Sequence, residues 1–134
     1  MTTSTSPVTG VDFVVVPTQD AERARSFYTD VLGLEFVKQW GGMPAYEVQA
    51  GNLTLALMQM DAFGREFRPN GGPIALQVED FDAAHAALQE RGVTFASDVI
   101  DSGVCKQAYF ADPDGNPVGI HHRYAPKDAM PGDA

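Results

Sequence analysis

Residues 110–122 read FADPDGNPVGIHH, and this stretch predicts a strand, a tight turn and a second strand. Pro113 fixes a turn backbone, Gly115 and Asn116 tolerate a positive φ, and the Asp112 side chain can cap the turn. Alternating residues resume after the turn, as a strand requires. The end of the chain is therefore expected to form a β-hairpin.

Composition limits the class of protein. The 134 residues suit one compact domain, and 44% of them are hydrophobic. A formal net charge of −9 repels phosphate backbones, which argues against nucleic-acid binding. Cys105 is the only cysteine, so a reducing compartment fits and no intramolecular disulfide is expected. No apolar run approaches the roughly 18 residues that span a membrane, so we expect a cytoplasmic protein without membrane contact.

Upstream of the hairpin, hydrophobic periodicity predicts one order of elements twice. The first set is a strand, a helix and three strands, at Val11–Val16, Ala21–Leu32, Leu34–Trp40, Ala45–Gln49 and Leu53–Met60. A polar linker follows, broken by proline and glycine. The second set is Pro73–Val78, a helix from Asp80 to Arg91, Val93–Phe95, Val104–Ala111 and Pro117–His122.

The two halves also align with each other. Val14, Val16, Asp20 and Ala24 match residues of the same character sixty positions later, at Ile74, Leu76, Asp80 and Ala84. We therefore predict an α+β fold of two βαβββ modules that form a concave mixed sheet with the helices outside. The single domain covers residues 10–124, with module 1 at about 10–60, a linker at 61–72 and module 2 at about 73–124. Residues 1–9 are predicted to be a disordered tail and residues 125–134 a second tail.

A family resemblance rests on three features: the hairpin stretch, the segment FYTDVLGL at residues 27–34, and the repeat. Over about residues 10–124 the chain resembles the vicinal oxygen chelate superfamily. That superfamily includes glyoxalase I, extradiol dioxygenases, methylmalonyl-CoA epimerase and the bleomycin-type resistance proteins. The resemblance implies the two-module fold and a ligand site in the concave face, and it does not specify a reaction.

In metal-dependent members, the resemblance implies one ligand on the first and one on the last strand of each module. Carried onto this sequence, these positions are Phe13, Pro73, Gly119 and Ala56, or Thr54 if the register slips by two. None of these side chains offers a carboxylate or an imidazole to a divalent cation. We therefore expect no metal and no cofactor.

Strand alternation predicts which side chains line the cavity. Leucines at 53, 55 and 57 are expected to face the helix, and Trp40 and Tyr46 to form a rim or wall. The predicted lining is apolar with few polar groups and comprises Phe13, Val15, Thr54, Ala56, Met58, Ala75, Gln77, Tyr109, Gly119 and His121. Alternation leaves open which parity of the seventh strand faces inward. Such a lining favours a small apolar or aromatic molecule, oriented by Gln77, His121 and Thr54.

Two classes of function remain open. The first is a metal-free, bleomycin-resistance-like protein that binds a small molecule. The second is an enzyme: a metal-free isomerase, lyase or cyclase with His121 as its acid or base, or a metal-dependent lyase or dioxygenase. No second catalytic group is evident, and we favour binding. Uncovered sheet edges also predict a homodimer, with the cavity either within one chain or shared between two.

Overall fold

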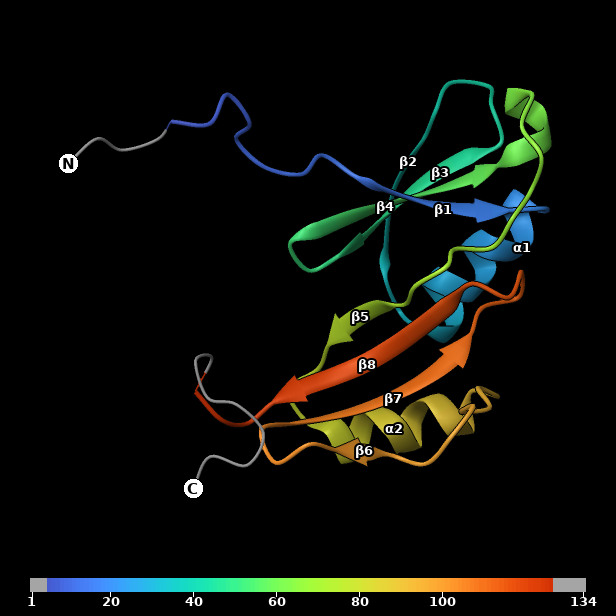
Figure 1. Ribbon diagram of the computed structural model, residues 1–134. Coiled ribbons are helices and arrows are strands. Elements are labelled where there is room, and N and C mark those ends of the chain that lie inside the picture. The colour runs from blue at the N-terminus through green and yellow to red at the C-terminus, as the bar shows by residue number, and fades with distance from the viewer. Residues whose placement is uncertain (1–4, 127–134) are drawn as a thin grey trace.

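The computed structural model describes residues 5–126 and contains the two predicted βαβββ modules (Figure 1). The first module is β1 (Val14–Thr18), α1 (Ala21–Ser26), η1 (Phe27–Val31), β2 (Glu35–Gln39), β3 (Ala45–Ala50) and β4 (Leu53–Gln59). A 3-10 turn, η2 (Met60–Phe63), begins the connection. The second module is β5 (Ile74–Gln77), α2 (Phe81–Glu90), β6 (Ile100–Asp101), β7 (Cys105–Ala111) and β8 (Pro117–Arg123). The α+β fold class is confirmed, whereas residues 1–4 and 127–134 of the tails predicted at 1–9 and 125–134 lie outside the described residues.

Each module forms its own four-stranded mixed sheet, in the orders β1-β4-β3-β2 and β5-β8-β7-β6. The first strand pairs in parallel with the last strand of its module, and the other pairs are antiparallel. The repeat extends to the register: Val14 lies beside Leu55, and its counterpart Ile74 lies beside Val118. The modules therefore place equivalent residues at equivalent points of two sheets.

Both helices begin in the same way. The carboxylate of Asp20 accepts a hydrogen bond from the Arg23 backbone N–H at 3.1 Å, and that of Asp80 accepts one from Ala83 at 3.0 Å. Such side-chain caps satisfy amide groups that have no partner within the helix. The predicted first helix continues from α1 through the π-helical η1 and ends before Gly33, whose φ is +75°.

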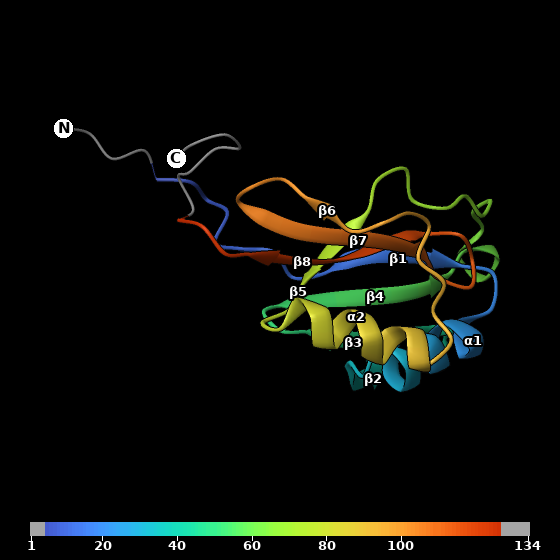
Figure 2. The ribbon, with the colours of Figure 1, turned by 90° about the horizontal axis from the view of Figure 1, so that it is seen from below.

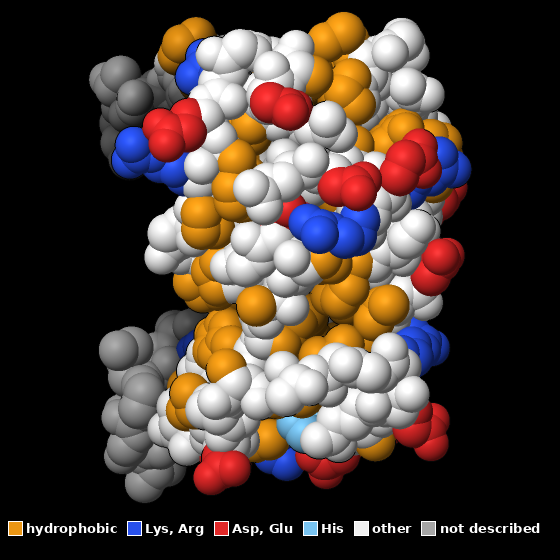
Figure 3. All heavy atoms as spheres, turned by 90° about the vertical axis from the view of Figure 1, so that its right-hand side faces the viewer, with side chains coloured by type: hydrophobic (Ala, Val, Ile, Leu, Met, Phe, Trp, Pro, Cys, Tyr) orange, Lys and Arg blue, Asp and Glu red, His pale blue; other side chains and the backbone are white. Residues whose placement is uncertain are grey.

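Apolar side chains from both modules share one core. α1 contacts β3 and β4 of its own sheet, α2 contacts β8, and the ring of Phe27 lies 6.3 Å from that of Phe110 across the modules. α2 runs along one face of the second sheet, while α1 lies near the ends of β7 and β8 (Figure 2). Viewed from the side, the molecule narrows between the modules, where hydrophobic side chains reach the surface (Figure 3). The fully buried members of this core include Val16, Tyr28, Val48, Leu55, Leu57 and Val118.

One predicted strand does not form. Val93–Phe95 leaves α2 as a loop, and the sixth strand is instead the short β6. Phe95 is held by its side chain, which stacks on His85 at 4.0 Å and meets Phe110 edge-on at 5.5 Å. The prediction was wrong because a short apolar run signals burial equally well in a loop and in a strand.

The first strand is shorter than predicted. β1 begins at Val14, and residues 5–13 run outward from the body in an extended, exposed segment (Figure 1). By the register of β1 and β4, Val11 would lie opposite Asn52. This residue belongs to the Gly51–Asn52 turn that precedes β4. Val11 therefore has no partner on β4, whereas Phe13, which would lie opposite Thr54, packs its ring on Trp40.

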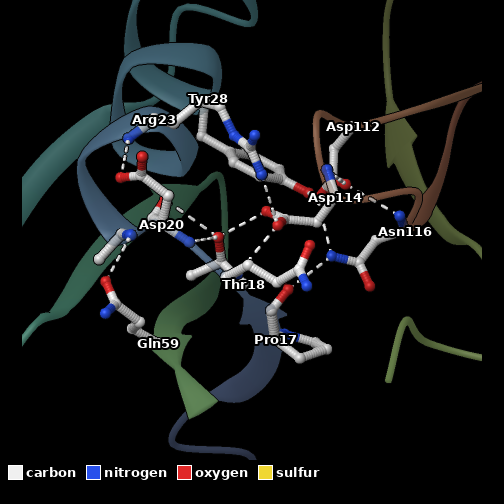
Figure 4. Close-up of polar contacts among 11 residues, drawn as sticks. Pro17, Thr18, Asp20, Arg23, Tyr28, Gln59, Asp112, Asp114 and Asn116 are labelled. Carbon is white, nitrogen blue, oxygen red and sulfur yellow. Dashed lines mark hydrogen bonds and ion pairs between the residues drawn. The ribbon is translucent and has the colours of Figure 1, made fainter. Parts of the chain in front are cut away.

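The hairpin between β7 and β8 joins the two modules through buried polar groups (Figure 4). The Asp112 carboxylate is 5% exposed and accepts hydrogen bonds from the Tyr28 hydroxyl at 2.7 Å and from Asn116 Nδ2 at 2.9 Å. Backbone N–H groups of Asp114 and Asn116 also donate to it, each at 2.9 Å. Asn116 Nδ2 donates in addition to the carbonyl of Pro17 in β1 at 2.7 Å.

Asp114 adds a second set of contacts from the same turn to the start of α1. Its carboxylate, fully buried, accepts hydrogen bonds from the Thr18 hydroxyl at 2.5 Å, the Gln19 backbone N–H at 2.9 Å and Arg23 at 2.8 Å (Figure 4). These partners come from residues 91–96 positions away in the chain. The stretch that predicted the hairpin therefore also fixes how the modules pack.

We expect Tyr28→Phe to flatten the loss of stability at alkaline pH. Burial, and then the nearby Asp112 charge, raise the pKa of the Tyr28 hydroxyl far above its ordinary value of 10.0. Below about pH 10 both folded and unfolded chains keep this proton. Above that pH only the unfolded chain releases it, so the free energy of unfolding falls by up to about 1.4 kcal/mol per pH unit from this group. Urea unfolding measured across this range should show a shallower slope for Tyr28→Phe, and an equal slope would contradict the assignment.

Candidate functional site

On the first sheet, the face opposite the helix carries an aromatic pair. Phe13 is 42% exposed, and its ring meets that of Trp40 edge-on with 5.3 Å between centroids. The Trp40 indole N–H donates to Glu47 Oε2 at 2.6 Å. Glu47 lies beside Ala56, which lies beside Val15 on the neighbouring strand. This face is therefore apolar around Ala56, while its carboxylates are Glu47, engaged by the indole and 4.0 Å from Lys38 Nζ, and Glu35 beside Gln49.

Thr54 and Met58 also lie on this face, two residues either side of Ala56 on β4. The Thr54 hydroxyl donates to Gln49 Oε1 at 2.7 Å, so its proton is already used within the protein. Both side chains are half-buried. Leu53, Leu55 and Leu57 point to the helix and join the core, as alternation predicted.

On the second sheet, the corresponding face presents two rows of side chains. One row runs across β5, β8 and β7 through Ala75, Gly119 and Tyr109. The next row consists of Gln77, His121 and Gln107. The parity left open for the seventh strand is thus settled, because Tyr109 shares the face of Gly119 and His121. The predicted polar groups of module 2 stand side by side on three strands.

Tyr109 lies directly over Gly119. A Cβ added to Gly119 would come within 2.4 Å of ring atoms Cδ1 and Cε1 of Tyr109, and 3.2 Å from the Ala108 carbonyl oxygen. Real Cβ atoms do not approach other heavy atoms at 2.4 Å, so glycine is required while the ring stays in place. The Tyr109 hydroxyl donates to Gln107 Oε1 on the same strand, and this hydrogen bond holds the ring in its position over Gly119.

Tyr46 does not lie where it was predicted. It faces the helix, beside Leu57, and is 5% exposed. Its hydroxyl donates to Glu22 of α1, and the Arg25 guanidinium lies 5.2 Å from its ring. The rim-or-wall prediction for this residue is wrong, because Tyr46 alternates in phase with the buried Val48.

The predicted lining residues fall into two groups. Val15 borders a hollow of about 430 Å³ beside the inter-module connection. Ala75, Gln77 and His121 border another of about 490 Å³ on the second sheet. Among the described strands, hydrogen-bonded ladders form only within each sheet and never between the two. The predicted lining residues are therefore divided between two separate sheet faces, one in each module.

Sequence reasoning missed one polar residue on these faces, Glu47, which pairs with Trp40. Alternation places Gln107 on the same side of the seventh strand as Tyr109, and in the structure it stands between Tyr109 and His121. A signal for Glu47 was present, since Tyr46 and Val48 are apolar while Glu47 and Gln49 are polar. That alternation assigns the polar pair to the face away from the core.

The residues present do not fit a divalent metal ion. Ala56 and Gly119 have no donor atom, Phe13 and Pro73 have apolar side chains, and the Tyr109 ring covers Gly119. Within residues 5–126, no three side chains of His, Cys, Asp or Glu come together in a way that could hold a metal ion. His121 and two neutral amides supply no charge to replace the cation's hydration.

The fold agrees with the comparisons to known proteins. The model of the glyoxalase/bleomycin resistance protein/dioxygenase superfamily matches residues 10–120, and the chain belongs to this superfamily. No curated protein matches the sequence significantly. No helix within the described part of the chain is long and apolar enough to cross a membrane.

Several solved structures are similar to this chain. TnmS3, an antibiotic binding protein from Streptomyces sp. CB03234, is 28% identical with a TM-score of 0.74, over 89% of this chain and 99% of that one. A superfamily member from Sphaerobacter thermophilus is 29% identical with a TM-score of 0.70, over 87% and 98%. A putative glyoxalase family protein from Bacillus anthracis is 21% identical with a TM-score of 0.75, over 90% and 99%, and shows the fold alone.

Proposed function

We propose that this protein is a metal-free binding protein for a planar apolar or aromatic small molecule. The observation that carries the proposal is Tyr109 over Gly119: an aromatic ring occupies the position at which metal-dependent relatives are expected to place a ligand. The Phe13–Trp40 pair adds a second aromatic surface on the other sheet. Apolar walls with few polar groups are typical of small-molecule sites. Similarity to an antibiotic binding protein supports the same class.

The binding-competent form is proposed to be a cytoplasmic homodimer. The open sheet faces leave apolar side chains in solvent, among them Phe13 at 42% and Ile100 at 45% exposure. A second copy that covers these faces would bury the apolar side chains. It would also place the lining residues of one chain opposite those of the other. Sedimentation at micromolar concentration should give twice the monomer mass, and a monomer would count against this assembly.

We expect a chelator to leave the melting temperature unchanged and a planar aromatic compound to raise it. EDTA removes nothing that stabilises the folded state if the site is metal-free. Fluorene at ten times its dissociation constant would add about 1.4 kcal/mol, or roughly 5 °C for a domain of this size. Differential scanning calorimetry with each additive measures both effects. One equivalent of zinc, nickel, manganese or iron, lost with EDTA together with several degrees, would refute the metal-free site.

Metal-free catalysis by His121 is the second candidate. Its imidazole is half-buried and forms no hydrogen bond with any described residue, so it is open to a ligand beside Gln77. A proton-transfer role would change the bound compound, whereas binding alone would not. Mass spectrometry of a compound recovered after incubation distinguishes them: an unchanged mass and isotope pattern in deuterated water supports binding.

A further inference from the structure

On the second sheet, the Tyr109 hydroxyl fixes which way the side-chain amide of Gln107 is turned. Its Oε1 accepts the Tyr109 hydroxyl proton, so its Nε2 is turned the other way. Within residues 5–126, Nε2 has one other contact, a long one of 4.0 Å to Cys105 Sγ. An amide nitrogen carries two N–H donors, and this arrangement leaves Nε2 with donor capacity on the open face.

The side chains beside Gln107 can turn either a donor or an acceptor toward a ligand, whereas the Gln107 amide is held in one orientation. The side chains of Gln77 and His121 form no hydrogen bonds with described residues, and each can present a donor or an acceptor to a ligand. The Gln107 amide keeps its Nε2 donors turned toward the open face as long as Tyr109 holds its oxygen. Tyr109 in turn lies across Gly119, where any larger residue would displace the ring.

We propose that Gln107 Nε2 donates a hydrogen bond to a carbonyl oxygen on the edge of the planar ligand, with Tyr109 as its positioning residue. This inference rests on the proposed function and adds the ligand's chemistry: a planar aromatic ketone or quinone rather than a hydrocarbon. A carbonyl oxygen accepts and never donates, so it matches a fixed donor. A hydrocarbon would bury the Gln107 N–H without a partner, which is unfavourable.

The test compares 9-fluorenone with fluorene, two flat neutral tricycles that differ in one carbonyl group. Equilibrium dialysis gives both dissociation constants, and quenching of Trp40, the only tryptophan, gives an independent readout. We expect fluorenone to bind at least about 10-fold more tightly, the size of effect that one unpaired buried donor produces. Because fluorene is the more apolar compound, hydrophobic partition alone predicts the opposite order.

Two variants test the roles of the residues. Tyr109→Phe keeps the ring over Gly119 but releases the Gln107 amide, so the preference should fall several-fold while fluorene affinity stays the same. Gln107→Glu replaces the donor by a carboxylate oxygen and should abolish the preference. Gln89→Glu, an exposed change of the same charge on α2, should preserve it.

The outcomes separate this inference from the proposed function. Equal or reversed affinities in the unmodified protein would overturn the carbonyl preference and leave aromatic binding intact. A full preference retained in Tyr109→Phe would overturn the positioning role. Failure of both compounds to bind would overturn the proposed function, and this inference with it.

Discussion

Asp112→Ala is expected to lower the free energy of unfolding by about 3–5 kcal/mol, the cost of leaving several buried polar groups without their charged partner. The lost carboxylate accepts four hydrogen bonds, from the Tyr28 hydroxyl, Asn116 Nδ2 and two backbone N–H groups. Tyr28 is fully buried, so its hydroxyl has no water to replace the carboxylate. The melting temperature should fall by roughly 10–20 °C.

The matched control is Asp98→Ala, which removes an exposed carboxylate that accepts no hydrogen bond from any described residue. It should change the free energy of unfolding by less than about 0.5 kcal/mol. Urea unfolding monitored by circular dichroism measures both variants. If Asp112→Ala behaved like the control, the buried hydrogen bonds of the hairpin would not stabilise the packing of the two modules.

Gly119→Val is expected to destabilise the protein by about 1–3 kcal/mol, although strand propensity alone predicts a gain of up to about 1 kcal/mol. The Tyr109 ring decides the sign of the change in stability, because it lies 2.4 Å from the position of the new Cβ. The Ala108 carbonyl at 3.2 Å limits how far the backbone can retreat. Affinity for planar aromatic compounds should fall as well, because the displaced ring no longer orients Gln107.

A double-mutant cycle isolates this clash. Tyr109→Ala removes the ring, so Gly119→Val introduced into Tyr109→Ala should no longer destabilise and should show the ordinary strand preference for valine. The coupling between the two positions should be about 1–3 kcal/mol. Additive effects in the free energy of unfolding would mean that the ring does not occupy the space above Gly119.

The aromatic ring over Gly119 also explains why restoring one family ligand would not restore a metal site. A glutamate at this position would have to displace Tyr109 before reaching any ion. Ala56, Phe13 and Pro73 would still offer no donor atom. The missing ligand at Gly119 on β8 and the covering ring of Tyr109 on the neighbouring β7 are therefore consistent with one another.

The sequence by itself determined the features that depend on neighbours along the chain. The turn at Asp112–Asn116 and the repeated order of strands and helix follow from local backbone preferences and hydrophobic period. Alternation also assigned Thr54, Ala56 and Met58 to one face, since successive side chains of a strand must point to opposite sides. The alternation of Tyr46 and Glu47 carried the same information, although the rim prediction for Tyr46 did not use it.

Only the tertiary structure decided which distant residues meet. Tyr28 and Asp112 are 84 positions apart, and Pro17 and Asn116 are 99 apart, so no local pattern relates them. Val93–Phe95 is apolar enough for a strand, but the rings of His85 and Phe110 hold Phe95 in a loop. The glycine at 119 could be recognised in the sequence as a missing ligand, yet the ring that fills its place lies on a neighbouring strand. Local preferences fix backbone conformation, whereas packing between remote segments fixes which side chains share a surface.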